Sequence, residues 1–338
     1  NRPHDKPPDQ FYRLDPVCDL RHRLLHRIHR QFLGHVRLSF LSCRLFGVHD
    51  SLLSERSMNT LILGLIAALC WGFHDICVRF LSQRTPMTAC IFVVLVTGLL
   101  FHLGLTGFTG GFSPLPATAI WLSLAAGVFF VIATFGLYGA FQRGPVRLVA
   151  PLIAAYPILS VAVAAIQGVT ISPLQWLAVF AIVMGVAVVA ALSDTSKDES
   201  PPKGPTIFFA LISAIGFAGT FALGHQAAVI SHEMPSTLVT RVLAVVLTVL
   251  VLLAFKQPFW PGKRAMPILI AMGLADGIAL FCVLSAGRLP NPQYAAVSSS
   301  MFGLLTILLA WGLLKEKMSL SQWAGCIIAF CGVGYLAL

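Results

Sequence analysis

Residues 172–176 have the sequence SPLQW and residues 319–323 have the sequence SLSQW, and each of these stretches begins an apolar run. In both, a Ser stands three residues before a Gln. This is the spacing of a capping box, in which each of the two side chains bonds a backbone N–H at the start of a helix. Gly185 and Gly332 recur at the same offset of 147 residues. The chain therefore contains an internal duplication, with a helix start at the same place in each copy.

The composition predicts that these helices lie in a membrane. The chain is 57% hydrophobic and 11% charged, with a mean hydropathy of +0.84. A helix needs about 20 apolar residues to cross about 30 Å of hydrocarbon. Ten stretches of this kind follow Met58, at about residues 60–82, 88–108, 117–140, 146–166, 173–193, 205–228, 236–256, 265–286, 292–314 and 319–337. We therefore expect an all-α polytopic membrane protein with ten transmembrane helices.

The longest polar link, residues 194–204, divides the ten spans into two sets of five. We expect a first repeat over residues 58–193 and a second over residues 205–338, joined by this linker. Because five is odd, the second copy must enter the membrane from the opposite side, which makes an inverted repeat. Inverted repeats of this kind place a binding site at their interface, near the middle of the bilayer.

Residues 1–57 differ from the rest, because they are basic and contain no apolar run of spanning length. One interpretation is a basic amphipathic anchor or a targeting peptide. The other is a disordered or non-native extension ahead of a start at Met58, and the absence of any earlier Met favours it.

No cofactor is predicted. The eight cysteines lack the paired spacing of a zinc or redox site, and most lie within apolar spans, where Cys behaves as a small hydrophobic residue. The net charge of +10 suits contact with anionic lipid and gives no reason to expect nucleic acid. No HExxH or GxSxG motif is present, so we expect no enzyme. An intramembrane enzyme and a non-transporting scaffold stay open as alternatives.

Basic residues indicate an orientation. Links that follow odd-numbered spans hold ten Lys and Arg residues, whereas links after even-numbered spans hold Arg288 alone. The positive-inside rule then places the odd links in the cytoplasm and both ends of the core outside.

Three motifs resemble those of a known family. They are ALCWG at residues 68–72, the stretch from Gly144 to Pro157 with Pro151 inside it, and Glu316 followed by the second capping box and Gly325. These are similar to the motifs of EamA-type transporters of the drug/metabolite transporter superfamily. The resemblance implies two inverted five-helix bundles that work by alternating access and export amino acids, other small metabolites or drugs. It also implies cytoplasmic termini, against the charge distribution.

The sequence departs from that family at two places. The acidic residue before the closing motif is present as Glu316 but is Val169 in the first half. The arginine that is common in the second helix of each copy is present as Arg241 but is Leu95 in the first half.

Polar residues in the spans are candidate site residues. Trp71, His74, Asp75 and Arg79 share one face of the first span. A charged residue in hydrocarbon costs at least about 2.5 kcal/mol on insertion scales, so a retained cluster indicates a functional site. The structural alternative is an ion pair between Asp75 and Arg79.

Two further positions carry polar groups. His225, which is the repeat equivalent of Arg79, and Gln226 lie in the sixth span, where they would face the first-span cluster. A helix-end histidine is the alternative. Asp276, in the middle of the eighth span, is a candidate for binding a proton or a substrate amine. Its alternative is a fixed ion pair with Arg241.

Spans three, four and nine offer lining residues. Tyr138, Tyr156 and the serines Ser298 and Ser299 would shape a cavity, because proline-broken and small-residue helices at matching positions indicate one. Plain helix packing is the alternative for the serines. The whole predicts a secondary transporter in a bacterial inner membrane that exports an amino acid or other small metabolite, with protons as a possible coupling ion. A multidrug exporter is the alternative.

Overall fold

A computed structural model describes residues 60, 62–156, 158–159, 162, 165, 170–192, 203–286 and 298–336. The chain divides into two units, Asn1–Glu55 and Arg56–Leu338, and all the described residues belong to the second. The predicted extension at residues 1–57 and most of the predicted linker at residues 194–204 lie outside the described part. The linker's last two residues, Lys203 and Gly204, already belong to a helix.

Every regular element in the described part is a helix. The helices are Ile62–Leu81, α2 (Met87–Thr109), α3 (Ala117–Arg143), α4 (Val146–Ala154), α6 (Pro173–Ala191), α7 (Lys203–Ile230), α8 (Glu233–Ala254), α9 (Met266–Ala286), α11 (Phe302–Leu309) with the π-helical turn η2 (Ala310–Leu314), and α12 (Leu320–Leu336). Six of the described helices are long and apolar enough to cross a membrane, and three shorter apolar helices accompany them. The expectation of an all-α polytopic protein is confirmed.

Both predicted capping boxes are confirmed. The Ser172 N–H donates to Gln175 Oε1 at 2.9 Å, and the Gln175 N–H donates to Ser172 Oγ at 3.2 Å. Ser319 and Gln322 form the same two bonds at the same two distances. Each box thus pairs two backbone N–H groups that would otherwise have no partner, one box at the start of α6 and one at the start of α12.

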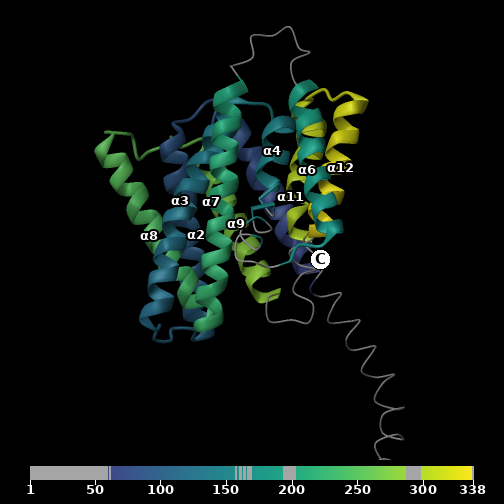
Figure 1. The fold of residues 1–338 in the computed structure, drawn as a ribbon. Coiled ribbons are helices and arrows are strands. Elements are labelled where there is room, and N and C mark those ends of the chain that lie inside the picture. Colours follow the sequence, from purple (N-terminus) through teal and green to yellow (C-terminus); the bar gives the residue numbers. More distant parts are fainter. Residues whose placement is uncertain are drawn as a thin grey trace, which may run out of the picture. The chain divides into compact units, whose positions relative to one another are not determined.

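The helices that these boxes begin run antiparallel and pack closely against each other (Figure 1). A Cβ added to Gly185 of α6 would collide with the backbone of α12 at Gly325. A Cβ added to Gly332 of α12 would lie 2.8 Å from the Ala178 carbonyl oxygen of α6. Ala178 and Gly325 are repeat equivalents, as are Gly185 and Gly332. The contact of Gly185 with Gly325 and the contact of Gly332 with Ala178 therefore join equivalent positions of the two repeats.

The same exchange relates the other long helices. α3 packs against α8, and its repeat counterpart α9 packs against α2, the counterpart of α8. α3 also packs along α7. The repeat counterpart of α7 is the helix Ile62–Leu81. α9, the counterpart of α3, packs against that helix, with Ala279 against Ala67. The described helices therefore make the same contacts in pairs, with the repeat-equivalent helices exchanged.

The shorter helices α4 and α11 pack against each other close to α7 (Figure 1). α4 contains Pro151 and ends at Ala154, three residues before Pro157, because helical conformation is disfavoured immediately before a proline. α11 continues into η2, and the chain then turns at Lys315, whose φ of 58° is left-handed. The predicted spans at 146–166 and 292–314 extend beyond these two helices into residues outside the described part.

Candidate functional site

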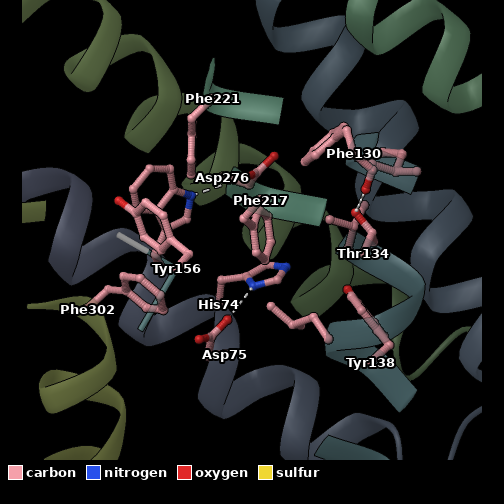
Figure 2. Close-up of a pocket in the computed structure, with 14 residues that line it drawn as sticks. His74, Asp75, Phe130, Thr134, Tyr138, Tyr156, Phe217, Phe221, Asp276 and Phe302 are labelled. Carbon is pink, nitrogen blue, oxygen red and sulfur yellow. Dashed lines mark hydrogen bonds and ion pairs between the residues drawn. The ribbon is translucent and has the colours of Figure 1, made fainter. Parts of the chain in front are cut away.

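A small pocket lies among the helix Ile62–Leu81, α2, α3, α7, α9 and α11, which come from both halves of the chain. Its volume is about 50 Å³, enough for a few water molecules. Figure 2 shows aromatic rings and a few polar side chains around it. Apolar walls with a few polar groups are typical of a ligand site.

The pocket's charged side chains are held by hydrogen bonds. His74 Nδ1 and Asp75 Oδ1 lie 3.1 Å apart (Figure 2). Asp276 receives two bonds, from Trp71 Nε1 to Oδ1 at 3.2 Å and from Arg241 Nη2 to Oδ2 at 2.8 Å. Asp276 lines the pocket, whereas Arg241 lines an adjoining space of about 40 Å³ that shares Asp276 with it.

Two buried polar atoms of the pocket have no hydrogen-bond partner within the described residues. They are Asp75 Oδ2 and the Tyr138 hydroxyl, and the two residues are 2% and 1% exposed. Most buried polar side-chain atoms in folded proteins are paired. Two unsatisfied oxygens in one pocket therefore indicate a place for a hydrogen-bonding ligand.

Many of the lining residues occur in repeat-related pairs, so equivalent positions of both halves contribute to the pocket and its neighbouring spaces. Each pair is separated by 146 residues, and each member lines this pocket or one of the two spaces that share residues with it. The pairs are Trp71–Phe217, Asp75–Phe221, Leu95–Arg241, Phe130–Asp276, Thr134–Leu280 and Tyr156–Phe302. Asp75, Arg241 and Asp276 each have an apolar counterpart. The shape of the site is thus nearly symmetric, whereas its charge is not.

A larger cavity of about 420 Å³ lies beyond Trp71, Tyr156 and Phe221, which line both spaces. Its other walls come from the second half of α7, the first half of α8 and the residues Leu280, Val283 and Ser299. Trp71 and Phe221 have ring centroids 6.1 Å apart, and Tyr156 and Phe221 5.5 Å apart. These rings form an aromatic layer between the small pocket and the larger cavity.

The opposite end of the bundle is tied together by polar contacts. Glu316 accepts hydrogen bonds from the backbone N–H groups of Val146 at 3.1 Å and Arg147 at 3.3 Å, at the N-terminus of α4. Arg79 Nη1 donates to the Phe141 carbonyl oxygen at 2.7 Å, and its Nε lies 4.0 Å from Glu316 Oε1. A carboxylate at a helix N-terminus accepts hydrogen bonds from the free N–H groups and interacts favourably with the positive end of the helix dipole. We call these contacts of Arg79 and Glu316 the latch.

The structure separates the predicted site residues into groups. His74, Asp75, Tyr138, Tyr156 and Asp276 line the small pocket.

Two more, His225 and Ser299, line the larger cavity instead. Gln226 and Ser298 line neither space, and Ser298 is buried at 6% exposure. The structural alternative expected an ion pair between Arg79 and Asp75. The structure has no such pair between these two described residues, and Arg79 takes part in the latch. Asp276 does form the expected pair with Arg241 and lines the pocket as well.

Sequence reasoning missed most of the aromatic lining, namely Phe130, Phe217, Phe221 and Phe302. One signal could have found them, because shifting Trp71, Asp75, Tyr156 and Asp276 by the repeat offset gives these four positions. Phenylalanines are common in apolar spans, so composition alone does not distinguish them.

Fold and site together define a helical membrane protein with a largely apolar pocket that is lined from two duplicated halves. The sequence model of the EamA-like transporter family matches residues 58–191 and again residues 204–338. The chain belongs to this family and is a multi-pass membrane transporter.

Other comparisons add the fold alone. No curated protein matches the sequence. One similar solved structure is a crystal structure whose description names no function. It is 18% identical, with a TM-score of 0.59, and the match covers 83% of this chain and 97% of that one. At this identity the likeness concerns the fold.

Proposed function

We propose that this protein is a secondary active transporter that works by alternating access and carries a small metabolite through the pocket between its halves. The observation that carries the proposal is the pocket's position, because its walls come in repeat-related pairs from both halves. Rocking one half against the other would expose such a site to each side in turn.

The proposed architecture is ten transmembrane helices in two inverted repeats, at residues 58–193 and 205–338, with a linker at 194–204. The antiparallel packing of α6 and α12 supports the inversion, since these helices are repeat equivalents. A second exchanged contact supports it too. A Cβ on Gly127 would lie 2.9 Å from the Thr240 carbonyl oxygen, and one on Gly273 would lie 2.7 Å from the Val94 carbonyl oxygen.

The two ends of the bundle differ as one state of an alternating-access cycle requires. The latch joins α4 to the segment before α12 at one end. At the other end lies the cavity of about 420 Å³, which is within the range of metabolite sites. Repeat-related positions explain the difference, because His225 stands where a second arginine would be and Val169 where a second glutamate would be.

The proposed substrates are amino acids or other small metabolites, exported across a bacterial inner membrane, with protons as the coupling ion. A drug exporter is the second candidate. It is favoured by the aromatic side chains Trp71, Phe217, Phe221 and Phe302, which can contact many flat ligands through their faces. A scaffold without transport has less support, because it has no use for a cavity of about 420 Å³ beside a pocket lined from both halves.

Untargeted measurement of exported metabolites tests this function. Cells that produce the wild-type protein are compared with cells that produce equal membrane amounts of Asp75→Asn, a nearly isosteric variant. We expect a defined set of metabolites to accumulate in the medium with the wild type and to fall with the variant. Identical media from wild-type, variant and empty-vector cells would contradict a transporter.

A further inference from the structure

The charges that face the small pocket are carboxylates. Asp75 and Asp276 line it, and His74 is the one lining residue in the described part that can become a cation. Arg241 is 1% exposed and lies behind Asp276, with the Phe130 ring 5.6 Å from its Cζ. A negatively charged ligand group in the small pocket itself would therefore meet Asp276 and not Arg241, which lines only the adjoining space of about 40 Å³.

The two carboxylates differ in what they can still bind. Both oxygens of Asp276 already accept hydrogen bonds, from Trp71 and from Arg241. Asp75 bonds His74 through Oδ1, while Oδ2 has no partner among the residues that the structure describes. Arg241 pairs with Asp276 through Nη2, and its Nε and Nη1 have no partner in the described part of the chain, so no Arg241 nitrogen bonds Asp75. Among the described residues, Asp75 Oδ2 is thus the one carboxylate oxygen of the pocket that accepts no hydrogen bond.

The surroundings of Asp75 complete a site for a cation. The Tyr138 hydroxyl is also unpartnered within the described part and has two lone pairs to offer. Trp71, Phe221 and Phe302 present aromatic faces and edges around the same pocket. Aromatic faces attract ammonium groups, most strongly where water is excluded. These groups suit a positive charge that is attached to an apolar body.

The volumes indicate how such a ligand would lie. The small pocket, at about 50 Å³, holds a head group and no more. The cavity beyond the aromatic layer, at about 420 Å³, has room for a body. An ammonium group near Asp75 would therefore carry its apolar body past Trp71 and Phe221.

We propose that the pocket binds an organic monocation, with its ammonium group donating to the Asp75 carboxylate, and that it selects amines over amino acids. The inference rests on the proposed function and narrows its substrates at the same site, from amino acids or other small metabolites to amines. Selection against amino acids follows from Asp276, which meets a ligand carboxylate with like charge. The repeat explains the site's origin, since the counterpart of Asp75 is Phe221 and the counterpart of Asp276 is Phe130. Each pocket-facing carboxylate thus stands where the other repeat has a phenylalanine.

Equilibrium binding to the purified full chain in detergent tests the proposal with three matched probes. Phenethylamine has the ammonium alone, phenylalanine adds a carboxylate to the same skeleton, and 3-phenylpropionate has a carboxylate alone. We expect phenethylamine to bind at least about tenfold more tightly than either other probe, the ratio that one charge-assisted hydrogen bond supplies. Equal or tighter binding of phenylalanine would overturn the proposal.

Variants assign the binding to the named atoms. Asp75→Asn should weaken phenethylamine binding at least about tenfold, and Tyr138→Phe by a smaller factor. Tyr335→Phe removes a hydroxyl from a residue that is 41% exposed on α12 and lines neither space, so it should leave binding unchanged. Unchanged binding to a folded Asp75→Asn protein, checked by its thermal unfolding, would overturn the site.

Counterflow in proteoliposomes separates this inference from the proposed function. Uptake of labelled phenethylamine that depends on Asp75 supports both. Uptake of phenylalanine without uptake of the amine leaves the transporter in place and overturns the substrate class. Binding of phenethylamine that depends on Asp75, with no uptake of any probe, supports the site and contradicts the transporter.

Discussion

At the scale of single residues, Arg241 shows how the site carries charge inside a membrane. Its side chain is 1% exposed, and its bond to Asp276 measures 2.8 Å. Removing one partner of a buried ion pair costs far more than removing both, because the remaining charge has no water to stabilise it. The pair is thus a structural requirement of the pocket wall as well as part of the site.

A double-mutant comparison tests this role. Asp276→Asn keeps an oxygen for the Trp71 N–H but leaves Arg241 uncompensated, so the free energy of unfolding should fall by about 3–5 kcal/mol. Adding Arg241→Leu should restore most of that loss, since Leu95 already occupies the repeat-related position. Unfolding in detergent measures both values. If the double variant is no more stable than Asp276→Asn, the charge of Arg241 is not the cause.

At the scale of elements, the latch connects α4 of the first half to the segment that leads into α12 of the second. Glu316 contacts the two first N–H groups of α4, and Arg147 Nη1 donates to the Lys317 carbonyl oxygen at 2.8 Å. An opening motion at this end must break these bonds. The latch should therefore set how often this end opens.

Thiol labelling can measure that opening. Ser82 lies near the latch and is 3% exposed, so Ser82→Cys, in a background without the natural cysteines, should react slowly with a maleimide. Glu316→Gln removes charge-assisted bonds and should raise the labelling rate by about tenfold. Lys317→Met is the matched control, because Arg147 bonds the backbone of Lys317 and not its side chain. An unchanged rate with Glu316→Gln would show that the latch does not control this end.

The packing of α6 on α12 makes a separate prediction. A Cβ on Gly185 would collide with α12, whereas one on Gly104 of α2 would meet nothing within 4 Å. Gly185→Ala should therefore reduce the unfolding free energy by about 1–3 kcal/mol through overpacking, and Gly104→Ala should not. Thermal unfolding of the two variants in detergent provides the comparison. Equal stability would mean that the two helices can separate at no cost.

At the scale of the whole molecule, the repeat is what made the fold predictable. Helix starts followed from the capping boxes at Ser172 and Ser319, whose bonds are local in sequence. The pocket was only partly predictable, because Phe221 and Phe302 are ordinary residues of apolar spans until a tertiary contact brings them together. The contacts of Arg79 could not be predicted for the same reason: Phe141 and Glu316 are distant in sequence, whereas helical spacing offered only the ion pair with Asp75 as a structural alternative.

Orientation is the remaining property of the whole chain, and the charge distribution predicts it. Ten basic residues in the odd links place the latch end in the cytoplasm. The larger cavity, at the other end, would then open to the outside. Thr237 lines that cavity, and Phe112, in the link between α2 and α3, is 62% exposed at the same end as the start of α8.

Single cysteines and a membrane-impermeant maleimide on intact cells test this orientation. Phe112→Cys and Thr237→Cys should be labelled from outside, and Gly204→Cys, which has open space around it at the start of α7, should be labelled only after the membrane is permeabilised. The reverse pattern would agree with the cytoplasmic termini implied by the family resemblance and would place the larger cavity on the cytoplasmic side. Export would then begin from the conformation seen here, because a substrate could reach the aromatic layer at Trp71 directly from the cytoplasm.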